Sequence, residues 1–121
     1  MSLDDCIKHC SECAQLCQRA KTHCIIDGKH VTIEHLNLLE DCVEICQTSA
    51  NFMLRGSKNH NLIYQICAQI CEACALECEK TCKENNLMKQ CANKCVECAQ
   101  MCTLMENDKQ GTLAKECCKN L

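Results

Sequence analysis

The segment from Cys67 to Cys82 carries five cysteines at helical spacing. It reads CAQICEACALECEKTC, so that successive thiols are four, three, four and four residues apart. Residues three and four apart are neighbours on one face of an α-helix, and at about 100° per residue the five sulfur atoms fall within an arc of roughly 80°. A core helix ordinarily carries Leu, Ile or Val on such a face. The segment therefore predicts a helix whose buried face consists of thiols.

The same cysteine pattern occurs three times in the chain. The segments CIKHCSECAQLC, CAQICEACALEC and CANKCVECAQMC begin at Cys6, Cys67 and Cys91, and each follows the pattern C-x3-C-x2-C-A-x2-C. A fourth segment contributes only Cys42 and Cys46. The repetition indicates three similar thiol-bearing helices and a fourth that is poorer in thiols.

Four long helices are expected because the chain has no proline and only three glycines, the residues that most often interrupt helices. Ser2, Thr32 and Asn86 stand where N-caps are needed, because their side-chain oxygens can accept from the first free backbone amides. The predicted helices span about residues 3–27, 33–55, 60–84 and 87–106.

Short connections between four amphipathic helices favour an antiparallel arrangement. We therefore predict an all-α fold, an up-down-up-down four-helix bundle over residues 1–106 with a Cys-lined core. Residues 107–121 form a tail, which is either irregular or a short helix and which contains Cys117 and Cys118. These two thiols either cap one end of the bundle, pass metal inward, pair with another subunit or have no role.

Composition narrows the function classes. The net charge is -3, and no basic run marks a surface for nucleic acid or membrane. No apolar run approaches the roughly 18 residues of a membrane span, and the N-terminus does not have the pattern of a signal peptide. We therefore expect a cytoplasmic protein, in which cysteines stay reduced and a high cysteine content indicates metal binding. No catalytic constellation is apparent, so we do not expect an enzyme.

The spacing of the thiols favours Cu(I). Two cysteines at i and i+4 of a helix have Cβ atoms about 5–6 Å apart, which is too far for a disulfide. A linear S–metal–S unit with bonds of about 2.3 Å spans about 4.6 Å, and thiolate ligands select Cu(I). One monovalent ion per thiolate also leaves the core neutral, whereas zinc at that ratio would leave it cationic. We expect several Cu(I) ions per chain.

The candidate metal ligands are the thiols predicted to face the core. They are Cys6, Cys10, Cys13, Cys17, Cys24, Cys42, Cys46, Cys67, Cys71, Cys74, Cys78, Cys82, Cys91, Cys95, Cys98 and Cys102. The topology also gathers soft sulfur donors and imidazole donors at the two ends of the bundle. These residues are either core side chains or part of a site of metal uptake. One end would hold His9, Met53, His60 and Met105, and the other His35, Cys24, Cys82 and Met88.

The repeated C-x3-C helices in a short, proline-free chain resemble the four-helix-bundle copper storage proteins, specifically their cytosolic branch. The resemblance covers about residues 3–106. It implies a preformed bundle whose interior fills with many Cu(I) ions, held mainly by C-x3-C pairs. It also implies a mouth lined by Met or His, and a homo-oligomer, often a tetramer. Copper ions are the expected partners, with a donor or acceptor protein for the metal.

Three other functions remain open. The first is a general soft-metal protein that detoxifies zinc or cadmium. The second is an iron–sulfur electron-transfer protein, although such clusters ordinarily use cysteines on tight Gly- or Pro-bearing loops. The third is an interaction bundle whose thiols pack as small apolar side chains and bind nothing.

Overall fold

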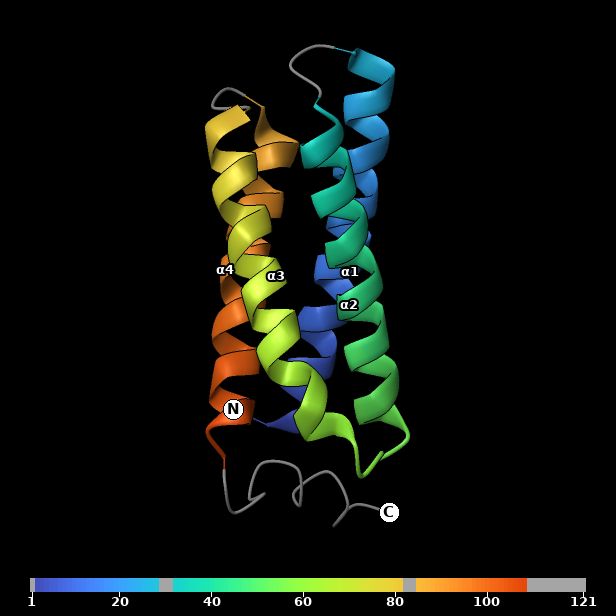
Figure 1. Ribbon diagram of the computed structural model, residues 1–121, viewed down its shortest axis with the longest axis vertical. Helices are drawn as coiled ribbons and strands as arrows, with labels where there is room; N and C mark the ends of the chain where they lie inside the picture. Colours follow the sequence, from blue (N-terminus) through green and yellow to red (C-terminus); the bar gives the residue numbers. More distant parts are fainter. Residues whose placement is uncertain (1, 29–31, 82–84, 109–121) are drawn as a thin grey trace.

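Four α-helices make up the described part of the structure. The structure is a computed structural model that describes residues 2–28, 32–81 and 85–108. The helices are α1 (Leu3–Asp27), α2 (Ile33–Leu54), α3 (His60–Thr81) and α4 (Asn86–Glu106) (Figure 1). The last residues of the predicted third helix, including Cys82, and most of the tail, including Cys117 and Cys118, lie outside the described residues.

The helix ends follow local capping chemistry. Ser2 forms a capping box with Asp5 at the start of α1, and the helix ends at Gly28 with a left-handed φ of 66°, a conformation that glycine adopts without strain. Thr32 caps α2 by accepting from the His35 amide. The predicted cap of α4 was wrong by one residue, because Asn85 rather than Asn86 accepts from the amides of Leu87 and Met88.

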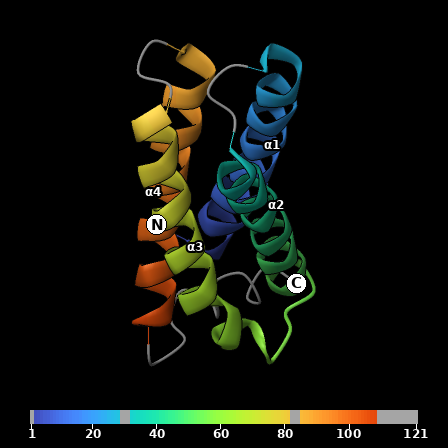
Figure 2. The ribbon, with the colours of Figure 1, turned by 45° about the horizontal axis from the view of Figure 1, so that its top comes forward.

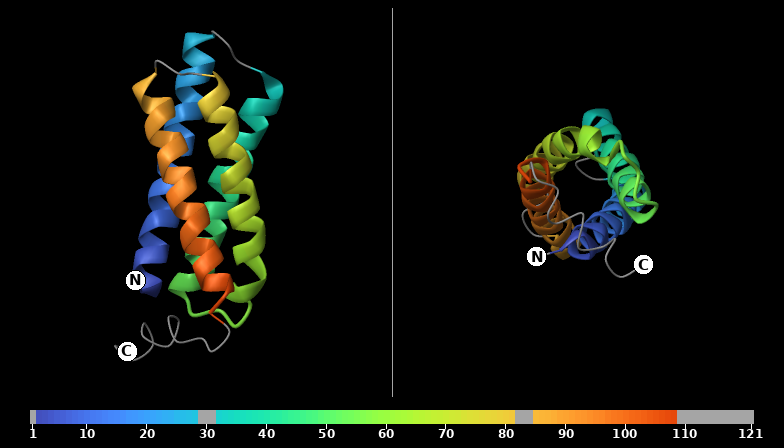
Figure 3. Two further views of the ribbon diagram at one scale, coloured as in Figure 1. Left: turned by 90° about the vertical axis from the view of Figure 1, so that its left-hand side faces the viewer. Right: turned by 90° about the horizontal axis from the view of Figure 1, so that it is seen from below.

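The helices form an antiparallel up-down-up-down bundle, as predicted. Each helix packs against the next in the chain, and α1 packs against α4 to close the ring, which is visible end-on in Figure 3. In the tilted view of Figure 2, α1 and α2 lie side by side, as do α3 and α4. None of the helices in the described part is both long and apolar enough to cross a membrane.

The two ends of the bundle differ in their side chains. We call the end with the start of α1 and the connection between α2 and α3 the Tyr64 end, which is at the bottom of Figure 1. The opposite end, where α1 finishes and α2 begins, is the His35 end. Larger buried side chains gather towards the ends of the helices, among them Leu3, Met53, Tyr64, His35 and Met88.

The middle of the core consists mostly of small side chains. Fifteen cysteines in the described ranges are buried, each at most 5% exposed. Alanines fill the spaces beside them, at Ala14, Ala20, Ala50, Ala68, Ala75, Ala92 and Ala99. Thiols thus replace the branched hydrocarbon that an ordinary bundle packs between its helices.

A candidate metal centre in the bundle core

The C-x3-C-x2-C spacing places the thiols of α1, α3 and α4 on the inward faces of their helices. Fifteen of the sixteen predicted ligands lie in the described residues, and every one is buried. They are thiols and not disulfides. The structure therefore gathers these side chains in one interior region, and Cys82 lies outside the described residues.

Thiols of α1 and α4 meet across the closing interface of the ring. Cys17 Sγ lies 3.5 Å from Cys91 Sγ and 3.6 Å from Cys95 Sγ. Cys10 Sγ is 3.6 Å from Cys98 Sγ, and Cys13 Sγ is 3.7 Å from Cys95 Sγ. The thiols form a ladder of weak S–H···S hydrogen bonds along these two helices.

The two cysteines of α2 connect this ladder to α3. Cys46 Sγ is 3.5 Å from Cys71 Sγ and 3.9 Å from Cys98 Sγ. Cys42 Sγ is 3.8 Å from Cys71 Sγ and 3.9 Å from Cys95 Sγ. Although α2 has the fewest thiols, its two sulfur atoms therefore connect the thiols of the other helices into one network.

The closest sulfur atoms belong to different helices. The sulfur atoms of the C-x3-C pair Cys42 and Cys46 are 3.9 Å apart, farther than the 3.5 Å of Cys17–Cys91 and of Cys46–Cys71. The C-x3-C spacing predicts pairs on one helix, but it does not specify which thiols of different helices come together. The axial position of each helix relative to its neighbours determines those contacts, so the sequence held no direct signal of them.

Four groups of four buried cysteines have all their sulfur atoms within 4.8 Å of one another. Each group draws its members from at least three helices. The groups are Cys10, Cys67, Cys98 and Cys102; Cys13, Cys17, Cys42 and Cys95; Cys13, Cys46, Cys71 and Cys98; and Cys17, Cys74, Cys91 and Cys95. We call them the four thiol quartets.

The thiols perturb the acidity of their neighbours. Hydrogen bonding by the thiols of Cys10 and Cys102 lowers the pKa of Cys6 to about 5, despite its burial. Hydrogen bonding to Cys102 and Cys6 raises the pKa of Cys10, and burial raises it further. Metals bind the thiolate and not the thiol, so a soft cation must displace these shared protons. Once it has done so, sulfur donors surround it on several sides.

The Tyr64 end is closed by large side chains. Leu3, Met53, Tyr64 and Met105 are each at most 5% exposed there. The Tyr64 hydroxyl and His60 Nδ1 share a hydrogen bond of 2.6 Å, and burial raises the pKa of Tyr64. The sequence placed Met53, His60 and Met105 at one end of the bundle, and the described helices bring them there.

His9 was expected at the same end, and its contacts lie elsewhere. Its Nδ1 is 3.3 Å from Lys94 Nζ and 3.5 Å from Glu97 Oε2, between α1 and α4. Lys94 also pairs with Glu12 at 2.7 Å. His9 therefore belongs to an ionic cluster on the outer surface, and these contacts do not favour a role in metal uptake.

The His35 end presents a nitrogen donor beside a thiol. His35 is 1% exposed, and its Nε2 is 3.4 Å from Cys78 Sγ. Thr81 Oγ1 donates to the Glu77 carbonyl and lies 3.4 Å from His35 Nδ1, so that it can accept from Nδ1–H. In the uncharged imidazole with its proton on Nδ1, the Nε2 lone pair faces Cys78. Sequence reasoning missed Thr81, although it follows Cys78 by one helical turn.

Ser49 occupies a core position where another thiol would fit the pattern. It follows Cys42 and Cys46 on the inward face of α2 and is fully buried. Its Oγ has no hydrogen-bond partner among the described residues. An unsatisfied buried hydroxyl costs stability, and at Ser49 the row of inward-facing thiols on α2 is interrupted.

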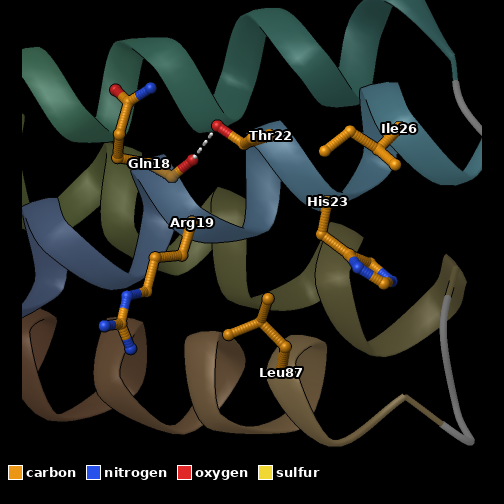
Figure 4. A pocket seen from close by; sticks show the side chains of 6 residues that line it. All are labelled: Gln18, Arg19, Thr22, His23, Ile26 and Leu87. Carbon is orange, nitrogen blue, oxygen red and sulfur yellow. Dashed lines mark hydrogen bonds between the residues drawn. The ribbon is translucent and has the colours of Figure 1, made fainter.

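A groove on the outside of the bundle contains no thiol. It has a volume of about 420 Å³ and lies between α1 and the start of α4 (Figure 4). His23 Nε2 accepts from Asn85 Nδ2 at 2.7 Å here, which ties α1 to the cap of α4. The lining residues are Gln18, Arg19, Thr22, His23, Ile26 and Leu87.

Comparison with known proteins gives consistent matches over most of the chain. A family model described as "Copper storage protein" matches residues 1–107. The cysteine-rich protein YhjQ of Bacillus subtilis (strain 168) is 32% identical over 101 residues, which cover 83% of this chain and 92% of that protein.

Two solved structures share the fold. A crystal structure of Nmul_A1745 from Nitrosospira multiformis has a TM-score of 0.76 and 42% identity, covering 86% of this chain and 94% of that one. The Cu(I)-bound copper storage protein BsCsp3 has a TM-score of 0.74 and 30% identity, covering 85% of this chain and 96% of that one.

Proposed function

The chain belongs to the copper storage protein family, and from this premise we propose that its core thiols are the ligands of stored Cu(I). The observation that carries the proposal is a continuous network of buried sulfur atoms that joins all four helices. The Cu(I)-bound state of BsCsp3, which has the same fold, supports the assignment of the metal. The ligands are the fifteen described core cysteines, together with Cys82 by its place in the repeat.

Charge balance favours many monovalent ions. Each Cu(I) that replaces a thiol proton leaves the core uncharged, so that filling the interior does not accumulate charge in a medium of low polarity. Thiolates that each contact two ions then allow roughly one Cu(I) per thiolate, or about fifteen ions for the fifteen described thiols.

Storage in the cytoplasm is the role that this chemistry suits. Thiols remain reduced there, and buried thiolate ligation keeps copper away from other proteins and from redox reactions. We assign no catalytic step to the chain, because its charged side chains such as Lys94, Glu12 and Glu97 pair with one another on the outer surface.

Metal uptake is proposed to occur at the His35 end. The Nε2 of His35 lies 3.4 Å from the Cys78 sulfur at this end, and these two atoms would be the first two ligands of an incoming ion. The Tyr64 end has a bulky, hydrogen-bonded aromatic side chain in the corresponding place. A copper donor or acceptor protein would therefore approach the His35 end.

Self-association is also proposed, as the family resemblance implies. The exposed apolar side chains Ile25, Ile26 and Leu62 are 60%, 80% and 73% exposed, and burying them between copies of the chain would be favourable. Leu36 packs partly against the core and contributes less to this surface.

An anaerobic titration with Cu(I) against a chromogenic chelator tests the proposal. We expect about fifteen tightly held ions per chain, and Cu(I) should displace Zn(II) and Cd(II) when complexes are compared by native mass spectrometry. Fewer than a handful of tightly bound Cu(I) ions would overturn a storage role. A saturated zinc form that is more stable than the copper form would favour zinc detoxification.

A further inference from the structure

The spacing of the thiol quartets fits a different metal geometry from that of linear Cu(I). Zinc–sulfur bonds of about 2.3 Å place the four sulfurs of a tetrahedron about 3.8 Å apart, whereas a linear unit needs about 4.6 Å. The sulfur separations across helices include 3.6 Å for Cys10–Cys98, 3.9 Å for Cys10–Cys102 and 3.5 Å for Cys17–Cys91. Several sulfur pairs in the quartets thus lie near tetrahedral spacing, and all four sulfurs of each quartet lie within 4.8 Å of one another.

We propose that the copper-free bundle binds two divalent tetrahedral cations, of which Zn²⁺ is the physiological example, each held by four thiolates. One ion is held by a quartet that contains Cys95 and the other by a quartet that contains Cys98. This inference does not rest on copper storage, because it concerns the ion held when copper is absent.

The number of sites follows from how the quartets overlap. Every quartet contains either Cys95 or Cys98, and no quartet contains both. The two quartets with Cys95 also share Cys17, and the two with Cys98 share no other member. Two ions with separate ligands therefore always use one quartet of each kind, and a third ion finds no complete set among the described residues.

Charge decides which quartets are occupied. Four thiolates around one divalent ion carry a net charge of about -2, so two such sites repel each other. The two quartets that lie farthest apart along the bundle are therefore occupied. One consists of Cys10, Cys67, Cys98 and Cys102, and the other of Cys17, Cys74, Cys91 and Cys95. On α1 and α3, Cys13 and Cys71 lie between the two sites.

The remaining central thiols stabilise both sites as protonated donors. Cys13 lies 3.7 Å from Cys95, Cys42 lies 3.9 Å from Cys95, and Cys46 lies 3.9 Å from Cys98. Each can direct its S–H towards a metal-bound thiolate, a charge-assisted hydrogen bond that is stronger than one between neutral thiols.

Bound zinc would hold the helices together and keep the thiols from oxidising until copper arrives. Because soft thiolate ligands select Cu(I), the arriving copper displaces the two divalent ions.

Anaerobic titration of the reduced, metal-free chain with Co(II) tests the inference, since tetrahedral thiolate-bound cobalt has intense visible bands. We expect these bands to saturate at two ions per chain and to disappear when Zn(II) is added. Cys95→Ser and Cys98→Ser should each reduce the number to one, and the double variant should bind none. Cys24→Ser, a core thiol outside the quartets, is the matched control and should retain two.

The helical circular dichroism of each variant shows whether it is folded, and a parallel Cu(I) titration separates the two proposals. Cobalt that binds without the intense bands would overturn the inference, as would a cobalt number unchanged in folded Cys95→Ser and Cys98→Ser. A chain that takes up many Cu(I) ions but no Co(II) contradicts the zinc sites and leaves copper storage intact. A chain that binds two Co(II) but little Cu(I) does the reverse.

Discussion

Replacing Cys46 by alanine should lower the copper capacity of the chain and reduce its stability moderately. Cys46 is fully buried, and its sulfur lies 3.5–4.0 Å from those of Cys42, Cys67, Cys71 and Cys98. Removal of one buried heavy atom of this size loses about 0.8 kcal/mol of transfer free energy. A cavity of roughly 25 Å³ adds about 0.6 kcal/mol. The expected loss is about 1.4 kcal/mol of unfolding free energy, or a fall of about 5 °C in melting temperature.

The copper number of this variant follows from its place in the network. If each thiolate contacts two Cu(I) ions, the loss of Cys46 leaves two ions with one sulfur ligand fewer. Capacity should then fall by roughly one or two ions from about fifteen. Cys46→Ser fills most of the cavity but removes the soft donor, so it should show the same loss of copper with a different change in stability.

Ser49→Ala is the matched control on the same face of α2. It removes one buried atom whose hydroxyl has no partner among the described residues, so stability should be unchanged or slightly higher. Its copper number should equal that of the parent. Anaerobic denaturation gives the stability, and competition with a chromogenic chelator gives the copper number. An unchanged copper number in folded Cys46→Ala and Cys46→Ser would refute the assignment of core thiols as ligands.

Three further changes test other parts of the site. Ser49→Cys should extend the thiol lining of α2 and raise the copper number by about one, measured by chelator competition; no gain in a folded variant would contradict the inward position of residue 49. Lowering the pH should weaken Cu(I) binding, because hydrogen bonding and burial raise the pKa of thiols such as Cys10 and bound copper must displace those protons; an affinity independent of pH would argue against thiolate ligation. His35→Ala should slow copper loading in stopped-flow mixing several-fold, whereas His60→Ala should not, and the opposite order would place uptake at the Tyr64 end.

The helices and their buried faces could be predicted because both depend on local spacing. Cysteines repeated at three and four residues define one helix face. Ser2 and Thr32 cap the starts of helices and Gly28 ends α1, by chemistry that is visible within a few residues. The antiparallel order followed from the short connections. The family resemblance could be seen as well, since the repeated C-x3-C-x2-C pattern is its diagnostic feature.

The contacts between helices could not be predicted in the same way. Whether Cys17 meets Cys91 or Cys95 depends on the axial position of α4 relative to α1, which no single segment encodes. The position of His9 illustrates the point, because its helix face is close to the thiol stripe and yet its partners are Lys94 and Glu97. The pairing of His35 with Thr81 likewise requires α2 and α3 to be placed together.

An interior of cysteine and alanine makes the bundle extensible. The unit C-x3-C-x2 occupies seven residues, or about 10 Å of helix, and it needs no matching of bulky side chains from one layer to the next. Adding one such unit to each of the four helices would lengthen the reservoir by that distance and supply about eight more sulfur atoms, while both ends keep their present structure. The metal capacity of this architecture therefore depends on the length of its helices, and it can change during evolution while the two ends of the bundle stay the same.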